Sequence, residues 1–479
     1  MMRPRRPPWR LLAAALPLGL GACATHTPPP SFAADPPTEW QAPLPHNGSV
    51  TDLTTWWQQQ ADPLLAQLIE AAQAVNPNVA SARSRIAQAR AAQTSAEAAL
   101  KPTVDGSLSG SRGITQPIIP LGTTLQATVQ ASWEVDLFGG NRAALEAARA
   151  RLGGARAAWH EARVSVAAEV ANQYVSLRSC QRQLAVMQAD ATSRAETARL
   201  TELAAQAGFQ APAFSALARA SAAEGNARVA QQRAQCDLDV KALVALTALS
   251  EPALRQRLAE AQAKFVAFSS IAISGVPAQL LAQRPDLYTA EQEVAAASAD
   301  LGQAQAQRYP RLGLSGSVGR LDFRSTSLDG NITTWSVGPI TLSVPILDGG
   351  RRAANIAAAQ ARYEEAAATY RARARQAVRE VEEALVNLQS TAARNEDALI
   401  ATEGYRASFL ATESRYRGGL ASLVELEDAR RTALSAELAL LALQRERQVS
   451  WIALYRAAGG GWTSPTAEPS RTASQASSP

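Results

Sequence analysis

Two cysteines, Cys180 and Cys236, have the spacing in this sequence that most clearly predicts chemistry. Gly208 lies midway between them, 28 residues from each, and glycine commonly ends a helix. If two antiparallel helices meet at Gly208, both thiols lie at the same level, about 42 Å from the turn. In an oxidising compartment this arrangement predicts a disulfide bond. Two buried free thiols are the alternative.

The other side chains that enzymes commonly use are scattered along the chain. His26, His46 and His160 lie far apart, and the first two fall near one end of the sequence. The sequence contains no spacing typical of metal ligands, activated nucleophiles or phosphate-binding loops. We therefore expect no enzyme activity, no metal and no cofactor beyond a covalent lipid.

That lipid is predicted from the first 23 residues. Four arginines within the first ten residues precede an apolar run at 11–20, which is too short to span a membrane and is typical of an export signal. The run ends in Leu-Gly-Ala-Cys at 20–23, which resembles the lipobox of bacterial lipoproteins; an ordinary cleavage site is the alternative. We expect residues 1–22 to be removed and Cys23 to carry a covalent lipid such as palmitate. By the same resemblance Ala24, where an Asp would favour the inner membrane, favours the outer membrane.

The basic balance of the chain does not indicate a nucleic-acid partner. The formal net charge is +5, and loss of the four arginines in the signal leaves +1. No later segment has about 18 uninterrupted apolar residues, so we expect no membrane-spanning helix. Hydrophobic residues make up 47% of the chain but aromatic residues only 5%, which favours long, closely packed helices over a bulky core.

Several landmark residues recur in order, which indicates a duplicated unit. The landmarks and their counterparts are Pro77 and Pro285, Pro102 and Pro310, Gly139 and Gly349, and Gly208 and Gly419. Their separation is 208 residues at both prolines, 210 at the double glycine and 211 at the last glycine. Such a small drift is expected of a tandem repeat with minor loop changes.

We predict two structural repeats, 46–270 and 271–458, between a Pro-rich lipidated segment at 23–45 and a disordered tail at 459–479. Each repeat contains a leading helix, two strands, a long helix and a return helix. In the first repeat the strands fall near 102–138, the long helix at 142–207 and the return helix at 211–248. The equivalent ranges in the second repeat are 310–347, 352–418 and 421–458. The leading helices are expected at 64–100 and 277–308.

The predicted strands alternate strictly in polarity. From Leu125 to Leu137, every second residue is apolar and the residues between them are polar. A soluble sandwich also alternates in this way, but four strands in two distant pairs have too little sequence around them to form a covering layer. Strands of about ten residues suit a bilayer, yet a barrel needs about eight strands and lipid tolerates no open edge. The barrel must therefore be shared between chains.

The two long helices are predicted from an absence of proline. Neither 142–208 nor 352–418 contains one, and each stretch of 67 residues would form roughly 100 Å of helix. Gly139, Gly140, Gly349 and Gly350 precede these helices and would allow the chain to change direction between strand and helix.

Three stretches resemble the outer membrane efflux protein family, the TolC-like channels, and specifically its lipoprotein branch paired with RND pumps. The stretches are Trp56-Trp57 with Asp62-Pro63-Leu64-Leu65, Gly275 to Gly319, and Ser414 to Arg431. The resemblance implies a homotrimer in which twelve strands form an outer-membrane barrel continuous with a periplasmic barrel of twelve helices. It also implies partnership with a periplasmic adaptor protein and an RND-type inner-membrane transporter, besides outer-membrane lipid.

The function implied is passive export of drugs or other small toxic compounds. A type I protein secretion channel is the alternative within the family, and a structural periplasmic lipoprotein without a pore is the alternative outside it. By the same resemblance, the turns Gly208-Phe209 and Gly419-Leu420 would meet the adaptor. Tyr416, Glu425 and Asp428 would form the periplasmic gate, with Glu427 as a nearby acidic alternative. Without the resemblance, Glu425 and Asp428 would be read simply as acids at a helix N-terminus, which the helix dipole favours.

Overall fold

The computed structural model describes residues 27–31, 36–44, 55–60, 62–114, 121–261, 268, 270–271, 277–326 and 329–463. Cys23, His26 and His46 lie outside these residues. The chain divides into two compact units, each assembled from three separate stretches. Unit 1 comprises residues 1–34, 84–156 and 289–371, and unit 2 comprises 35–83, 157–288 and 372–479.

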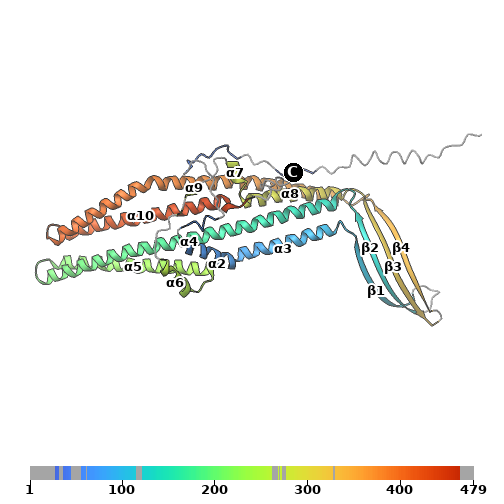
Figure 1. Cartoon of the computed structure of the whole chain (residues 1–479), viewed down its shortest axis with the longest axis horizontal. Coiled ribbons are helices and arrows are strands. Elements are labelled where there is room, and N and C mark those ends of the chain that lie inside the picture. The colour runs from blue at the N-terminus through green and yellow to red at the C-terminus, as the bar shows by residue number, and fades with distance from the viewer. Residues whose placement is uncertain are drawn as a thin grey trace, which may run out of the picture. The chain divides into compact units, whose positions relative to one another are not determined.

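Unit 1 contains a four-stranded antiparallel sheet (Figure 1). Its strands are β1 (Thr103–Gly113), β2 (Gly122–Val135), β3 (Arg311–Ser325) and β4 (Asp329–Ser343), paired in that order. The central pair, β2 and β3, joins the two halves of the sequence, for example where Val129 lies opposite Val318. Because cross-strand partners share a face, most apolar residues of the four strands lie together, and many of them are exposed, while Leu321, Phe323 and Ile332 lie on the opposite face.

Two helices of 67 residues each follow the strand pairs. They are α4 (Gly140–Gln206) and α9 (Arg351–Arg417), which begin and end within two residues of the predicted ranges. The return helices are α5 (Pro212–Thr247) and α10 (Leu423–Ala457). Among the described residues, no helix is both long enough and apolar enough to cross a bilayer.

The leading helices differ from the sequence expectation because each is interrupted before a proline. The first is divided into α2 (Pro63–Val75) and α3 (Pro77–Ala98), and the second into α7 (Pro277–Leu281) and α8 (Pro285–Ala306). Asn76, between the first two, has an extended backbone with ψ of 128°. The ring of a following proline disfavours the helical conformation, which explains the break.

Two further elements were not predicted. Helix α6 (Glu251–Glu260) follows the first return helix, and a short 3-10 turn, η2 (Gly459–Gly461), lies within the predicted tail. Gly459 contacts the backbone of Gln283 and Gly460 contacts Val164, so this turn packs against the rest of unit 2. The tail is therefore ordered at its first residues.

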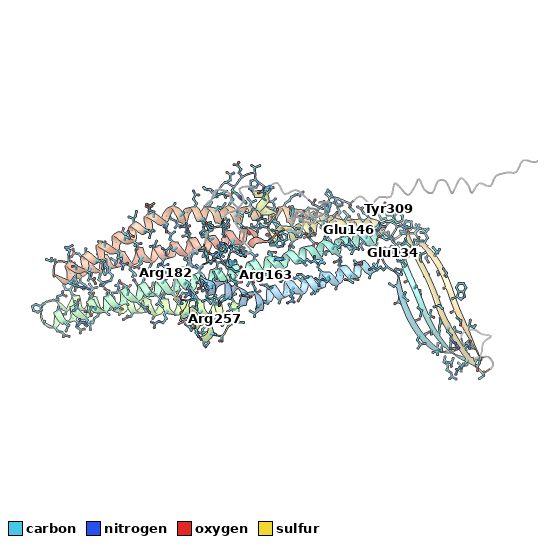
Figure 2. All side chains as sticks on the ribbon, viewed as in Figure 1. Glu134, Glu146, Arg163, Arg182, Arg257 and Tyr309 are labelled. Atoms are coloured by element: carbon cyan, nitrogen blue, oxygen red, sulfur yellow. A yellow bond between two sulfur atoms is a disulfide. The ribbon has the colours of Figure 1, made fainter. Side chains whose placement is uncertain are left out.

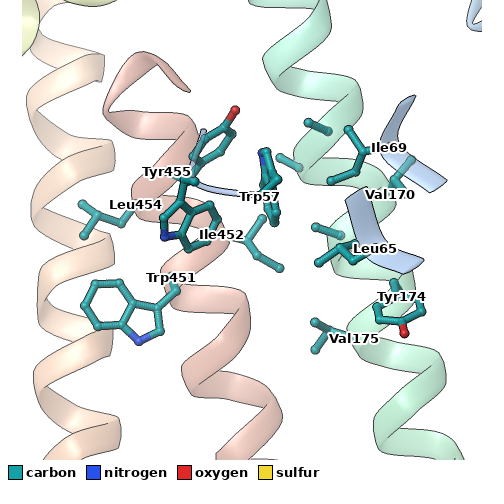
Figure 3. Packing of buried hydrophobic residues seen from close by; sticks show 14 of the residues in the cluster. Trp57, Leu65, Ile69, Val170, Tyr174, Val175, Trp451, Ile452, Leu454 and Tyr455 are labelled. Carbon is teal, nitrogen blue, oxygen red and sulfur yellow. The ribbon is translucent and has the colours of Figure 1, made fainter. Parts of the chain in front are cut away.

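The main hydrophobic core lies in unit 2. Figure 3 shows side chains of α10, including Ile452 and Leu454, together with those of α2 and α4, including Leu65 and Val170. Trp56 is fully buried, and its ring stacks on that of Tyr455 with 5.2 Å between centroids. The tryptophan pair is thus a core anchor, which stabilises the meeting point of these helices.

Unit 1 has a thinner core built from small residues. Ala296 and Ala299 of α8 pack on Ala147 of α4, while Leu301 and Ala304 of α8 pack on Ala359 of α9. Small side chains let helix backbones approach closely, so α8 fits beside the first turns of both long helices. This explains why a chain with few aromatic residues can form closely packed helices.

Candidate functional site

The joint between β2 and α4 is stabilised by an aspartate. Gly139 has a positive φ of 75°, while Gly140 is already the first residue of the helix. The carboxylate of Asp136 accepts hydrogen bonds from the backbone N–H groups of Asn141 (3.1 Å) and Arg142 (2.9 Å). The side chain therefore satisfies donors that a helix start leaves without partners.

The second joint repeats this arrangement. Gly349 and Gly350 have φ values of 64° and 89°, a region that favours glycine. Asp348 accepts from the N–H groups of Gly350 (3.0 Å) and Arg352 (3.1 Å), and these bonds, the backbone bond from Arg352 foremost, lower the pKa of its carboxyl. The sequence prediction named the glycines but missed Asp136 and Asp348, although both stand just before the glycine pairs.

Aromatic contacts reinforce the first joint. The rings of Phe138 and Tyr309 stack with 4.8 Å between their centroids, and the indole N–H of Trp133 donates to the carbonyl of Leu100 at 3.0 Å. Figure 2 labels Tyr309 and Glu134 where the strands meet the helices. The contacts connect β2 and the turn that follows it to the segments just after α3 and α8.

The tips of the two helical hairpins have the same backbone geometry. Gly208 and Gly419 both have φ of 75°. The N–H of Phe209 donates to the carbonyl of Ala204 at 2.8 Å, and the N–H of Leu420 donates to that of Arg415 at 2.7 Å. This is the Schellman pattern that ends helices at glycine. Phe209 and Leu420 are 86% and 73% exposed, so each tip presents one large apolar side chain.

The three predicted gate residues occupy different surroundings. Glu425 completes a capping box with Ser422, in which each side chain accepts from the other residue's backbone N–H. These hydrogen bonds lower the pKa of the Glu425 carboxyl. Asp428 is exposed and forms an ion pair with Arg431, one turn along α10. Both acids therefore have local partners in the single chain, besides lying on one helical face.

Tyr416 packs beside the first turn of α10. Its hydroxyl is 3.0 Å from that of Thr201, which lies on α4, and its ring packs on a small apolar cluster. The cluster contains Ala198, Ala218, Leu423 and Leu426. Tyr416 thus connects the end of α9 to the other hairpin.

A buried ion-pair network lies near the same tips. The guanidinium of Arg194 on α4 contacts Asp190 (2.7 Å) and Glu427 of α10 (2.9 Å). Glu427 also accepts from Ser221 of α5 at 2.7 Å and from Arg430. Because two arginines neutralise Glu427 inside the protein, it is unsuited to the exposed acidic role considered for it from sequence. No pattern in the amino-acid sequence singles out the members of this network.

Arg430 is the most buried member of this network. Its Nη2 atom donates to the hydroxyls of Thr197 (3.0 Å) and Ser193 (3.1 Å), both on α4. Burial lowers the pKa of its guanidinium, although an arginine remains charged at any ordinary pH. The network therefore supplies a second connection between α4 and α10 in unit 2.

Cys180 and Cys236 are joined by a disulfide bond in the structure. The bond connects α4 to α5 with 5.5 Å between the Cα atoms, and both residues are buried at the edge of the main core. The antiparallel arrangement about Gly208 brings the two residues level, as the spacing in the sequence requires. Among the described residues, His, Cys, Asp and Glu side chains form no group of three able to hold a metal ion.

The chain is similar in sequence to outer-membrane proteins of known function. The outer membrane efflux protein family matches residues 68–249 and 276–460. The pyoverdine export outer membrane protein OpmQ of Pseudomonas putida is 32% identical over 485 residues, covering 96% of this chain and 99% of that protein. Outer membrane protein OprJ of Pseudomonas aeruginosa is 29% identical, covering 96% of this chain and 97% of that protein.

The chain is also similar in structure to solved outer-membrane channels. The outer-membrane channel OprN superimposes with a TM-score of 0.81 at 28% identity, covering 92% of this chain and all of that one. The Campylobacter jejuni CmeC outer membrane channel, at 22% identity and a TM-score of 0.79, shows the same fold. The predicted fold class, mostly helical with four transmembrane-type strands per chain, is thereby confirmed, as are the outer-membrane location and a channel rather than an enzyme. The chain belongs to the outer membrane efflux protein family.

Proposed function

We propose that three copies of this chain form a passive efflux conduit across the outer membrane and into the periplasm. The observation that carries the proposal is the sheet of unit 1. Strands β1 and β4 each pair with one neighbour in the described sheet, so both edges are open. Lipid does not tolerate open edges, and three sheets of four strands would close into a barrel of twelve.

The two faces of the sheet support this arrangement. One face carries exposed apolar residues, among them Val104, Leu108, Val129, Trp335 and Ile340. The other face carries mainly hydroxyl and amide side chains, such as Ser107, Thr128 and Gln130. Apolar residues facing lipid and polar residues facing a water-filled lumen are typical of transmembrane barrels.

A lipid on Cys23 would add a second membrane attachment. Cys23 itself lies outside the described residues, but Thr27, four residues later, contacts Gly302 of α8. The carbonyls of Pro28 and Pro29 accept from Ser298 of α8 (2.7 Å) and Tyr363 of α9 (2.9 Å). Four residues span at most about 15 Å, so these contacts would hold a lipidated Cys23 close to the same helices.

The hairpin tips are suited to a gate. Exposed Phe209 and Leu420 at the glycine turns provide apolar contact points for a periplasmic adaptor. Glu425 and Asp428, repeated in three copies about an axis, would form rings of like charge that attract cations and resist close packing. Tyr416 and the Arg194 network would hold the hairpins closed until the adaptor engages them.

We assign the energy source to an RND-type transporter in the inner membrane, acting through the adaptor. The relatives suggest small molecules as substrates, since they include a toluene efflux pump outer membrane protein, TtgI, and a cation efflux system protein, CusC.

The two repeats would be residues 46–270 and 271–458, and each would supply half of the sheet. A type I protein secretion channel remains the second candidate, although no relative named above is described as one.

Planar bilayer recording tests the proposal. The purified chain should migrate as a heat-sensitive trimer on denaturing gels and produce discrete conductance steps. A folded protein that neither forms trimers nor conducts ions would instead be a structural lipoprotein. Deletion of the gene should sensitise cells to small toxic compounds if the conduit serves efflux, whereas loss of a secreted protein would favour the type I alternative.

A further inference from the structure

The apolar face of the sheet carries charged residues at the end of the strands where the β1–β2 and β3–β4 turns lie. Val318 and Trp335 lie side by side in the apolar part of this face. Alternate residues of a strand share a face, so Arg320 and Arg324 of β3 lie on this face too, two and six residues beyond Val318. The register places Arg112 of β1 there as well, because it lies opposite Thr123, which lies opposite Arg324.

These three arginines are exposed, and their charge is only partly compensated. Arg320 forms an ion pair with Asp322 at 3.3 Å. Asp329, the cross-strand partner of Arg324, accepts from the N–H of Ser325 at 3.1 Å. Within the described part of the chain, neither Arg112 nor Arg324 forms a salt bridge, so two guanidinium groups are available to another anion.

The height of the apolar face sets the level of the arginines in the membrane. On β2 this face runs from Val135 to Leu125, ten steps of about 3.3 Å, which gives roughly 25 Å of height at a tilt near 40°. That matches the apolar band of an outer-membrane barrel. Arg112 and Arg324 lie one row beyond Leu125, level with lipid headgroups, and Arg320 lies one row inside, from where a long side chain can reach the surface.

The connections of the strands indicate which leaflet of the membrane the three arginines face. The helices α4 and α9 follow the opposite ends of β2 and β4, so in a channel whose helices enter the periplasm the turn end faces the cell exterior. Arg112 and Arg324 are two strands apart, about 10 Å, so they can contact two phosphate groups. A guanidinium binds phosphate through two parallel hydrogen bonds, which a lysine cannot do.

We propose that Arg112, Arg320 and Arg324 form a binding site for the phosphorylated glycolipid of the outer leaflet, with its phosphate groups held on the outer surface of the barrel. The proposal rests on the membrane orientation given under the proposed function. It assigns to this surface a specific lipid rather than general contact with a bilayer. Repeated three times around the barrel, the site would anchor the channel in the outer leaflet.

Lipid A titrated into the full-length protein in non-ionic detergent tests the site, with thermal unfolding as the readout. Lipid A should raise the midpoint of the wild-type protein, while dephosphorylated lipid A should not. The triple variant Arg112→Gln, Arg320→Gln, Arg324→Gln should bind lipid A at least about tenfold more weakly. Arg311→Gln, at the periplasmic end of β3, is the matched control and should bind as the wild type does.

Three results would contradict the proposed lipid site or its assignment to the glycolipid. Equal binding by the triple variant, or equal stabilisation by dephosphorylated lipid A, would overturn the proposal. Equal stabilisation by phosphatidylglycerol would overturn the assignment to the glycolipid. Conductance in pure phosphatidylcholine bilayers, which contain no lipid A, tests the proposed channel separately. The triple variant should conduct as the wild type does there, which shows that it folds.

Discussion

The Nη1 atom of Arg194 lies 2.9 Å from the Oε2 atom of Glu427, which joins helix α4 to helix α10 although the two residues are 233 positions apart. The side chains are 6% and 17% exposed. Water therefore screens this pair only slightly, and losing one partner would leave the other charge buried. The pair therefore connects the two hairpins near their tips.

Glu427→Gln should loosen this connection. The variant keeps the side-chain shape but leaves Arg194 and Arg430 without a shared carboxylate, at a cost of about 3 kcal/mol in local stability. We expect a larger single-channel conductance in planar bilayers, since the hairpins would be released from one another. Glu196→Gln is the control, because its exposed pair with Arg199 lies within a single helix. A conductance equal to that of the wild type would show that the network does not restrain the tips.

The acidic rings are tested by Glu425→Gln combined with Asp428→Asn. Glutamine at this position preserves the capping box, so the variant removes charge without removing the cap. The preference for cations should fall, because three copies of each carboxylate would no longer attract them. The measurement is the reversal potential under a potassium chloride gradient.

A control for the acidic rings is Glu224→Gln, an exposed acid on α5 that pairs with Arg228. It should leave the reversal potential unchanged. If the double variant also leaves it unchanged, the two acids act only as helix-end residues. Glu427 could not then take over the role, since it is enclosed by arginines.

Much of the fold could be predicted because its signals are local and long. The strict alternation in β2 and the 67-residue stretches without proline each repeat a single physical preference many times. The breaks at Asn76 and before Pro285 were missed because apolar helical sequence continues on both sides of the proline. There the local restriction on the preceding residue outweighed the surrounding pattern.

The site was less predictable because its contacts are distant in the sequence. Arg194 and Glu427 are two among 47 basic and 42 acidic residues, and nothing in their neighbourhood identifies them as partners. They meet because the two hairpins lie side by side with both turns at the same end (Figure 1). By contrast, Cys180 and Cys236 could be paired from the sequence, because the turn lies midway between the only two cysteines in that repeat.

Asp348 should control the start of α9 in a pH-dependent manner. Asp348→Ala removes the acceptor for the N–H groups of Gly350 and Arg352, so the Arg352 amide should exchange its hydrogen about fivefold faster. Because the hydrogen bond from the Arg352 backbone lowers the pKa of this carboxyl in the folded chain, the stabilisation that comes from its charge is complete above the unfolded pKa and is lost as pH falls through the lowered pKa.

Hydrogen exchange measured at several pH values checks this prediction. Asp348→Asn is the matched variant, since it retains a hydrogen-bond acceptor without the charge. Its difference from the wild type should vanish at low pH, whereas the difference between the alanine and asparagine variants should persist. A pH-independent difference between wild type and Asp348→Asn would contradict a role for the charge.

Cys23→Ser should remove the lipid without destroying the channel. If the strands themselves hold the protein in the membrane, the variant should conduct as the wild type does once reconstituted. Mass spectrometry of the N-terminal peptide should show an acylated cysteine in the wild type and none in the variant. An unmodified Cys23 in mature wild-type protein would contradict the lipoprotein assignment.

The disulfide between Cys180 and Cys236 should stabilise unit 2 by closing a loop of 56 residues in the unfolded chain. Replacing both cysteines with alanine should cost about 2–4 kcal/mol and lower the thermal unfolding midpoint. A reductant should also lower the thermal unfolding midpoint of the wild type, but it should leave the midpoint of the double variant unchanged. This comparison distinguishes the loss of the disulfide bond from the loss of side-chain packing. Non-reducing peptide mapping identifies the bond directly, and recovery of both residues as alkylated thiols would mean that they lie side by side without being joined.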